Sequence, residues 1–149
     1  MRNYILCDID HTLSNAAWRD DMIGGEGGWD AYHAASVDDE PVTDICRAIC
    51  LFNFLDHDII ALTTRPEKWR DLTMKWMMKH GISVDELLMR PNDDYRPEWE
   101  TKLDLAVRRF GSEDGVRQNV AFILDDSETV ATAFRGLGIT VLQVFARRD

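Results

Sequence analysis

The chain has 149 residues, of which 45% are hydrophobic and 30% charged, and this composition excludes wholesale disorder. The length fits one compact domain over residues 1–149, with room for only a small insertion. The net charge of −10 disfavours broad capture of a nucleic-acid backbone, although a small basic pocket could still bind one phosphate. No apolar run approaches the ~18 residues that span a bilayer, and the N-terminus leads directly into a strand. We therefore expect a cytoplasmic protein without membrane contact.

The first predicted element is an apolar strand over residues 4–7, which is followed by Asp8-Ile9-Asp10-His11-Thr12-Leu13. In an extended segment residues i and i+2 point the same way, so the carboxylates of Asp8 and Asp10 can meet one metal ion and one substrate. The alternative is a strand-end turn, in which the Asp and Thr side chains only satisfy the backbone.

Residues 14–42 lose clear periodicity and are rich in glycine and acidic residues. A loop of this length inside a small domain is usually functional, and its aromatic residues indicate that it folds over something. Trp29 and Tyr32 are candidates for stacking on a base or sugar. Packing beneath the insertion is the alternative, because large aromatic side chains prefer burial.

The rest of the chain alternates helices with short, continuously apolar strands. The predicted helices are Thr43, as N-cap, to about residue 56, Pro66 to Gly81, 97–110 opened by Pro97, and one capped by Ser127 that stops near Gly136 or Gly138. The predicted strands are 59–63, 87–89, 121–124 and 140–144. This pattern predicts an α/β fold, a parallel sheet with helices on both faces, whose ligands bind beyond the carboxyl ends of the strands.

Polar residues follow three of the predicted strands. They are Asp8 and Asp10 after the first strand, Thr63, Thr64 and Arg65 after the second, and Asp125 and Asp126 after the fourth. The sheet rule predicts that they converge on one crevice. Two acidic pairs in one site repel each other and raise their pKa values unless a cation intervenes. A site of carboxylate oxygens suits Mg²⁺, which shares its coordination shell with waters and a phosphate.

This arrangement resembles the haloacid dehalogenase (HAD) superfamily of phosphotransferases over essentially the whole chain. The DxDxT motif matches Asp8 to Thr12, the Thr or Ser that ends the second strand matches Thr63, the lysine matches Lys102, and the acidic pair matches Asp125-Asp126. The resemblance implies a Rossmann-like fold with strand order 3-2-1-4-5 and a cap insertion at about residues 14–42. His11 departs from the pattern, because that position is usually glycine.

The chain is also similar to the 3′-phosphatase domains of bacteriophage polynucleotide kinases. Their Ser-Gly-Arg corresponds to Thr63-Thr64-Arg65, and their Arg, Arg and Lys at six-residue intervals correspond to Arg90, Arg96 and Lys102. The final segment, from Leu124 to Val144, resembles those domains as well. Their kinase domain has no counterpart in the chain.

The resemblance implies a role for each matched residue. Asp8 is the implied nucleophile, Asp10 the general acid and base, and Thr63 and Lys102 contact the phosphoryl group. The implied Mg²⁺ ligands are Asp8, the backbone carbonyl of Asp10, and Asp125, with Asp126 in or beside the outer shell. The substrate-binding candidates are Arg65, Thr64, Arg90, Arg96, His11 and Trp29. Arg90 and Arg96 are expected at the substrate entry, with ordinary surface ion pairs as the alternative.

Three functions follow from these expectations. The first is a Mg²⁺-dependent phosphomonoesterase that acts through an aspartyl-phosphate on the 3′-phosphate of a nucleic acid or nucleotide. The second is a phosphatase of 5′-mononucleotides, including deoxyribonucleotides. The third is a binding module that keeps the fold without turnover. A wide basic opening would favour a nucleic-acid strand as the substrate, and a closed aromatic lid would favour a mononucleotide.

Overall fold

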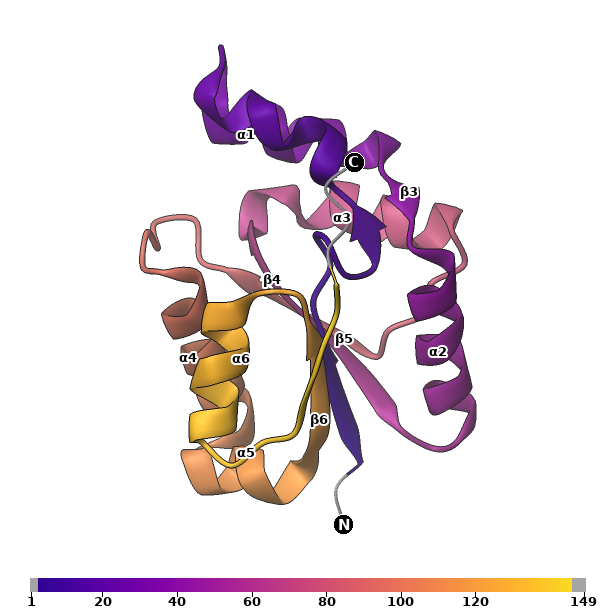
Figure 1. Ribbon diagram of the computed structural model, residues 1–149, viewed down its shortest axis with the longest axis vertical. Coiled ribbons are helices and arrows are strands. Elements are labelled where there is room, and N and C mark those ends of the chain that lie inside the picture. Colours follow the sequence, from indigo (N-terminus) through magenta and orange to yellow (C-terminus); the bar gives the residue numbers. More distant parts are fainter. Residues whose placement is uncertain (1–2, 146–149) are drawn as a thin grey trace.

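The computed structural model describes residues 3–145 and is built on a five-stranded parallel sheet (Figure 1). The strands are β1 (Tyr4–Cys7), β4 (Asp58–Pro66), β5 (Glu86–Arg90), β6 (Val120–Asp125) and β7 (Val141–Gln143). They lie in the order β5-β4-β1-β6-β7. Counting only these five strands along the chain, the order is 3-2-1-4-5, so the predicted Rossmann-like topology is confirmed. It places the ends of β1, β4 and β6 side by side.

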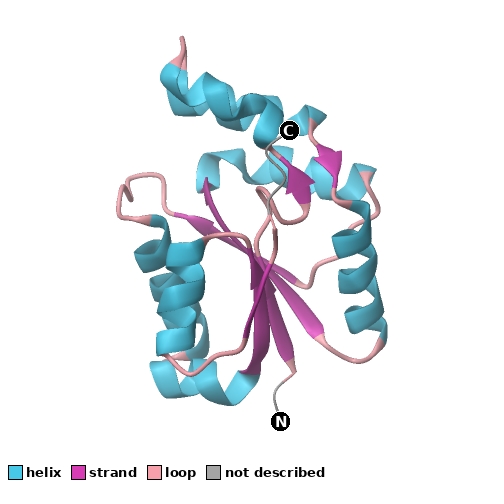
Figure 2. Ribbon diagram, viewed as in Figure 1, coloured by secondary structure: helices cyan, strands magenta, loops and turns pink. Residues whose placement is uncertain are grey.

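Helices cover both faces of the sheet, as Figure 2 shows. They are α2 (Thr43–Phe54) and α3 (Arg70–Lys79) on one face, and α4 (Glu98–Phe110), α5 (Glu113–Asn119) and α6 (Glu128–Gly136) on the other. Successive side chains of β1 alternate between the two faces: Ile5 and Cys7 pack with Trp76 of α3, whereas Leu6 packs with Phe134 of α6. Burial on both sides explains why the strands are apolar throughout.

The structure corrects the expectation that residues 14–42 form an irregular loop. The segment contains β2 (Ser14–Asn15), the 3₁₀ helix η1 (Ala17–Gly24), α1 (Gly28–Ala35), the 3₁₀ turn η2 (Ser36–Asp38) and β3 (Glu40–Pro41). β2 and β3 pair antiparallel. Several of its buried side chains are polar, among them Arg19, His33 and Ser36. Hydrophobic periodicity therefore could not reveal these short helices.

Two helix starts also differ from the sequence predictions. Val42, not Thr43, is the N-cap of α2, and its N–H donates to the Leu13 carbonyl as the chain leaves β3. Pro66 ends β4 and precedes the 3₁₀ turn η3 (Glu67–Trp69), so α3 begins only at residue 70. Helix α5, capped by the Ser112 side chain, was not predicted. Among the described residues no helix combines the length and the apolar character that a membrane crossing requires.

Candidate active site

Four side chains at the end of β1, in α4 and at the end of β6 form an acid–lysine cluster, in which Asp8, Lys102 and Asp125 are buried and Glu98 is partly exposed. Lys102 Nζ lies 2.9 Å from Asp8 Oδ1, 2.7 Å from Asp125 Oδ2 and 3.1 Å from Glu98 Oε1. Asp8 and Asp125 occupy the carboxyl ends of adjacent strands, and Lys102 reaches them from the second turn of α4. The sheet thus brings together three of the predicted residues, Asp8, Lys102 and Asp125.

Burial dominates the electrostatics of this cluster. Burial raises the pKa of Asp8 well above its usual value, and the neighbouring Asp125 carboxylate adds to the rise. Burial by itself lowers the pKa of Lys102, but the charges of Asp125 and Asp8 outweigh that effect and raise it. Two buried carboxylates therefore oppose each other's ionisation, and the single ammonium group only partly relieves the conflict.

The donor set of the cluster fits a divalent cation. One carboxylate oxygen each from Asp8, Glu98 and Asp125 can lie within 4.8 Å of the others. Oxygen ligands of this kind suit Mg²⁺, and three carboxylates facing one ammonium group leave an excess of negative charge that Mg²⁺ would neutralise. Asp126 is half-buried and lies outside this group, and the Asp10 carboxylate faces other partners.

Those partners form a second group, the arginine–carboxylate cluster of Asp10, Arg19, Asp39 and Arg65. Arg65 binds Asp10 with both Nη2 and Nε, at 2.7 and 3.0 Å, and Arg19 also donates to Asp10. Arg19 holds Asp39 through Nε at 2.8 Å and Nη2 at 2.7 Å. Both guanidinium groups are fully buried. The cluster ties the 14–42 segment to β4 across the end of β1.

Burial alone would raise the pKa of Asp10, but the charge and hydrogen bonds of Arg65, together with the charge of Arg19, hold that pKa well below its usual range. Asp10 lies in a tight turn in which the Ile9 carbonyl accepts the N–H groups of Thr12, Leu13 and Ser14. His11 adopts φ 64° in this turn, in the left-handed region that glycine favours. Its side chain binds Asp20 at 3.1 Å, so the departure from glycine leaves the turn intact.

A cavity of about 1090 Å³ opens above these clusters, and Asp8, Asp10, His11, Thr64 and Trp29 all line it. Thr63 is buried beside it, and its hydroxyl oxygen accepts the Arg65 N–H at 3.1 Å. Trp29 is 58% exposed and remains a stacking candidate. Tyr32, by contrast, is buried with its ring 4.0 Å from the Arg19 guanidinium, so for this residue the packing alternative holds.

Arg90 and Arg96 also line the cavity, but their charged groups are engaged within the protein. Arg90 donates to the carbonyl oxygens of Thr64 and Arg96, at 3.1 and 2.8 Å. Arg96 forms ion pairs with Asp94 at 2.7 Å and Asp104 at 3.0 Å. Both arginines thus line the cavity, and they form the ion pairs and backbone contacts that the alternative predicts.

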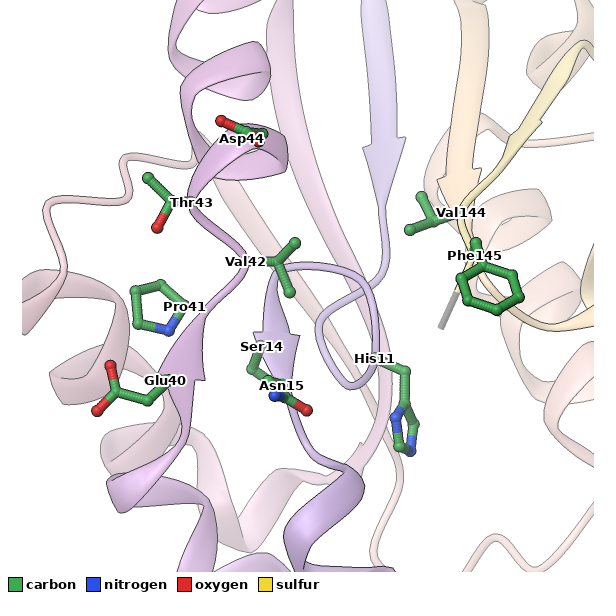
Figure 3. Close-up of a pocket in the computed structure, with 10 residues that line it drawn as sticks. All are labelled: His11, Ser14, Asn15, Glu40, Pro41, Val42, Thr43, Asp44, Val144 and Phe145. Atoms are coloured by element: carbon green, nitrogen blue, oxygen red, sulfur yellow. The ribbon is translucent and has the colours of Figure 1, made fainter. Parts of the chain in front are cut away.

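A smaller cavity of about 260 Å³ lies at the junction of the 14–42 segment, α2 and the end of β7 (Figure 3). His11 lines both cavities. The remaining lining residues of the smaller one include Asn15, Glu40 and Phe145, and none belongs to either charged cluster. The chemistry that the clusters can support therefore belongs to the larger cavity.

Three clustered residues were missed in the sequence. Glu98 precedes Lys102 by one helical turn, and this i, i+4 spacing was a readable signal. Arg19 and Asp39 lie 20 residues apart in a segment without periodicity. Nothing in the sequence marks them as buried, since arginine and aspartate are usually exposed.

Comparisons with known proteins agree with this geometry. A family model described as the polynucleotide kinase PNKP phosphatase domain matches residues 2–147. No curated protein gives a significant match. Two solved structures, of a Pnkp1/Rnl/Hen1 complex and of the Pnkp1/Rnl/Hen1 RNA repair complex, contain a similar chain at 27% and 25% identity, with TM-scores of 0.76 and 0.77. They match 96% and 95% of this chain, which spans only 46% and 42% of theirs.

The fold is shared more widely. A HAD-family enzyme from Bacteroides thetaiotaomicron, solved in complex with magnesium and inorganic phosphate, has a TM-score of 0.58 at 14% identity. The alignment covers 100% of this chain and 97% of that enzyme. At this level of identity the likeness concerns the fold alone.

Proposed function

Since the chain belongs to the family of polynucleotide kinase PNKP phosphatase domains, and is therefore a HAD-type phosphatase, we propose that it hydrolyses 3′-phosphate monoesters of nucleic-acid ends or nucleotides with the help of Mg²⁺. The observation that carries the proposal is the acid–lysine cluster, in which Asp8 lines the cavity and contacts Lys102, which also binds Asp125. The 14–42 segment serves as the cap over this site, within a single domain of 149 residues.

Asp8 acts as the nucleophile. One carboxylate oxygen attacks phosphorus, the bond from phosphorus to the leaving oxygen breaks, and an aspartyl-phosphate forms on Asp8. Lys102 stabilises negative charge on the nucleophile and on the phosphoryl oxygens, and the Thr63 hydroxyl donates to one of those oxygens. Asp8, Asp125 and the backbone carbonyl of Asp10 would hold Mg²⁺, with Glu98 and Asp126 beside it; the ion would supply charge neutralisation at the phosphoryl group.

Asp10 moves the protons. It donates one to the leaving alkoxide in the first step, and in the second it accepts one from the water that attacks phosphorus, so that phosphate leaves and the Asp8 carboxylate is restored. Arg65 and Arg19 keep Asp10 ionised in the absence of substrate. An ionised carboxylate can accept the proton of the second step, but it cannot donate the proton of the first. The first step therefore requires that Asp10 gain a proton before it protonates the leaving alkoxide.

The test is phosphate release by the purified chain with Mg²⁺, comparing kcat/KM for 3′- and 5′-phosphorylated mononucleotides and oligonucleotides. We expect the 3′-phosphates to be preferred. Asp8→Asn should release no phosphate while its circular dichroism matches the parent protein, because an amide cannot form the acyl phosphate.

Asp71→Asn is the matched control, an exposed position of α3 outside both clusters, and it should keep full activity. Release by Asp8→Asn at the parent rate would exclude this mechanism. Preference for 5′-mononucleotides would instead favour the second candidate function.

A further inference from the structure

Two exposed aromatic side chains line the cavity from separate parts of the fold. Trp29 belongs to α1 and is 58% exposed, and Tyr95 belongs to the loop between β5 and α4 and is 89% exposed. Figure 1 shows α1 in the 14–42 segment and the loop that leads into α4 as distinct parts of the fold. We call these two residues the aromatic mouth. Both rings line the cavity and leave aromatic surface exposed, on which the base of a nucleotide could stack.

The Trp29 ring is held in position by its neighbours. It stacks on the buried His33 with 5.8 Å between ring centroids and 24° between planes. It also meets the buried Tyr32 edge-on at 5.5 Å. These contacts fix one side of the indole and leave the remainder open, so a second ring can stack on it without reordering the side chain.

The charges around the cavity disfavour a phosphate backbone. Eight acidic side chains line it against three cationic ones, Lys68, Arg90 and Arg96. Lys68 is paired with Asp30 at 2.6 Å, Arg96 with Asp94 at 2.7 Å, and Arg90 with carbonyl oxygens. Among the described residues, therefore, each of these three cations already has a partner inside the protein. A groove that binds the backbone of a nucleic-acid strand requires an excess of cationic side chains that are available to the phosphates.

On the basis of the proposed phosphatase function, we propose that the cavity takes one 3′-terminal nucleoside, whose base stacks on the aromatic mouth, and does not bind the backbone of the strand behind it. Stacking accepts any base, because every base has a π-face. The substrate class is then 3′-mononucleotides and single-stranded 3′-ends of any length, with affinity from the terminal base and not from chain length.

The first test is the dependence of kcat/KM on chain length and salt. 3′-Phosphorylated mono-, tetra- and octanucleotides are compared with Mg²⁺ held constant and NaCl varied from about 50 to about 200 mM. We expect the three values of kcat/KM to agree within about threefold. The slope of log(kcat/KM) against log[NaCl] should also be the same for all three substrates. Each additional backbone phosphate that the protein neutralised would steepen the slope by about 0.7. An octanucleotide preferred at least about tenfold, with a steeper slope, would overturn the inference and leave the phosphatase function standing.

The second test substitutes the rings. Trp29→Leu and Tyr95→Leu should each raise KM for the 3′-mononucleotide by roughly 5- to 100-fold and change kcat little, because stacking on a base contributes to binding and not to the reacting bonds. Trp29→Phe and Tyr95→Phe retain a π-face and should restore most of the affinity. Phe54→Leu removes a ring that is 82% exposed and lies in α2, outside the cavity, and serves as the matched control.

The outcomes separate the two proposals. If Trp29→Leu and Tyr95→Leu both keep the KM of the parent protein and release phosphate normally, base stacking is refuted and the phosphatase function stands. No release from any 3′-phosphorylated substrate by the parent protein would instead refute the proposed function.

Discussion

Several charged side chains of this protein are buried in its interior, where charged groups are rare. Arg19, Arg65, Lys102 and Asp125 all have side chains without solvent exposure. Each is stable there only because an oppositely charged group faces it, since an unpaired buried ion is strongly destabilising. The two clusters, which contain the proposed catalytic residues, are therefore also an obligatory part of the folded structure.

Arg19 provides a direct test of this dependence. Arg19→Met leaves the buried Asp39 carboxylate without its main partner, so we expect the free energy of unfolding to fall by about 3–5 kcal/mol. Arg47→Met is the control, because Arg47 forms only an exposed pair with Asp44 and should change stability by less than ~0.5 kcal/mol. Urea unfolding measures both. Similar small losses in the two variants would show that the buried cluster contributes no stability.

At the scale of elements, the connection between α4 and α5 brings the backbones of two helices into close contact. A Cβ atom placed on Gly115 of α5 would lie 2.1 Å from the Phe110 carbonyl oxygen, a backbone atom at the end of α4. Glycine is needed here for space and not for an unusual dihedral angle. Because α4 carries Lys102 and Glu98, the packing of this junction also bears on the site.

Gly115→Ala should consequently destabilise the protein by about 1–3 kcal/mol, since the helices must separate to admit a methyl group. Gly136→Ala in α6 is the control: no atom lies within 4 Å of a Cβ placed there, and alanine should leave stability unchanged or raise it by up to ~1 kcal/mol. Thermal unfolding followed by circular dichroism distinguishes the two. A stabilising Gly115→Ala would contradict the assigned close contact.

For the molecule as a whole, the cation proposed for the acid–lysine cluster should be linked to folding. A ligand that binds only the folded state stabilises it by RT ln(1 + [L]/Kd), about 1.4 kcal/mol at ten times Kd. For a domain of this size that corresponds to a rise of about 3–6 °C in Tm. We expect MgCl₂ to raise Tm in the parent protein beyond the effect of NaCl at equal ionic strength.

Asp125→Asn should lose most of this Mg²⁺-dependent rise, because it removes one charged ligand from the cluster. Asp71→Asn, which changes an exposed charge, should retain the rise in full. A rise of equal size in all three proteins would place Mg²⁺ binding elsewhere.

The sheet, and the part of the site that the sheet carries, could be predicted without coordinates. Apolar strands that alternate with helices dictate a parallel sheet, and the position of Asp8 and Asp125 at strand ends follows from that topology. Lys102, in contrast, was identified only from the resemblance to the HAD superfamily. Thr63 follows the same rule as Asp8 and Asp125, because it ends the second predicted strand. Order along the chain is converted directly into spatial order along a sheet edge, which is why local sequence was sufficient for these residues.

The contribution of the 14–42 segment, in contrast, emerges only from the folded molecule. Its buried Arg19, Asp39 and His33 have no hydrophobic period, and their burial depends on partners that lie as far away in the chain as Arg65. Likewise, the spacing of Arg90 and Arg96 in the sequence does not reveal that Arg90 binds a carbonyl oxygen and Arg96 a carboxylate of the protein. These contacts leave the lining of the cavity acidic. Pairing of charges is a property of three-dimensional proximity, and the sequence states only which charges are present.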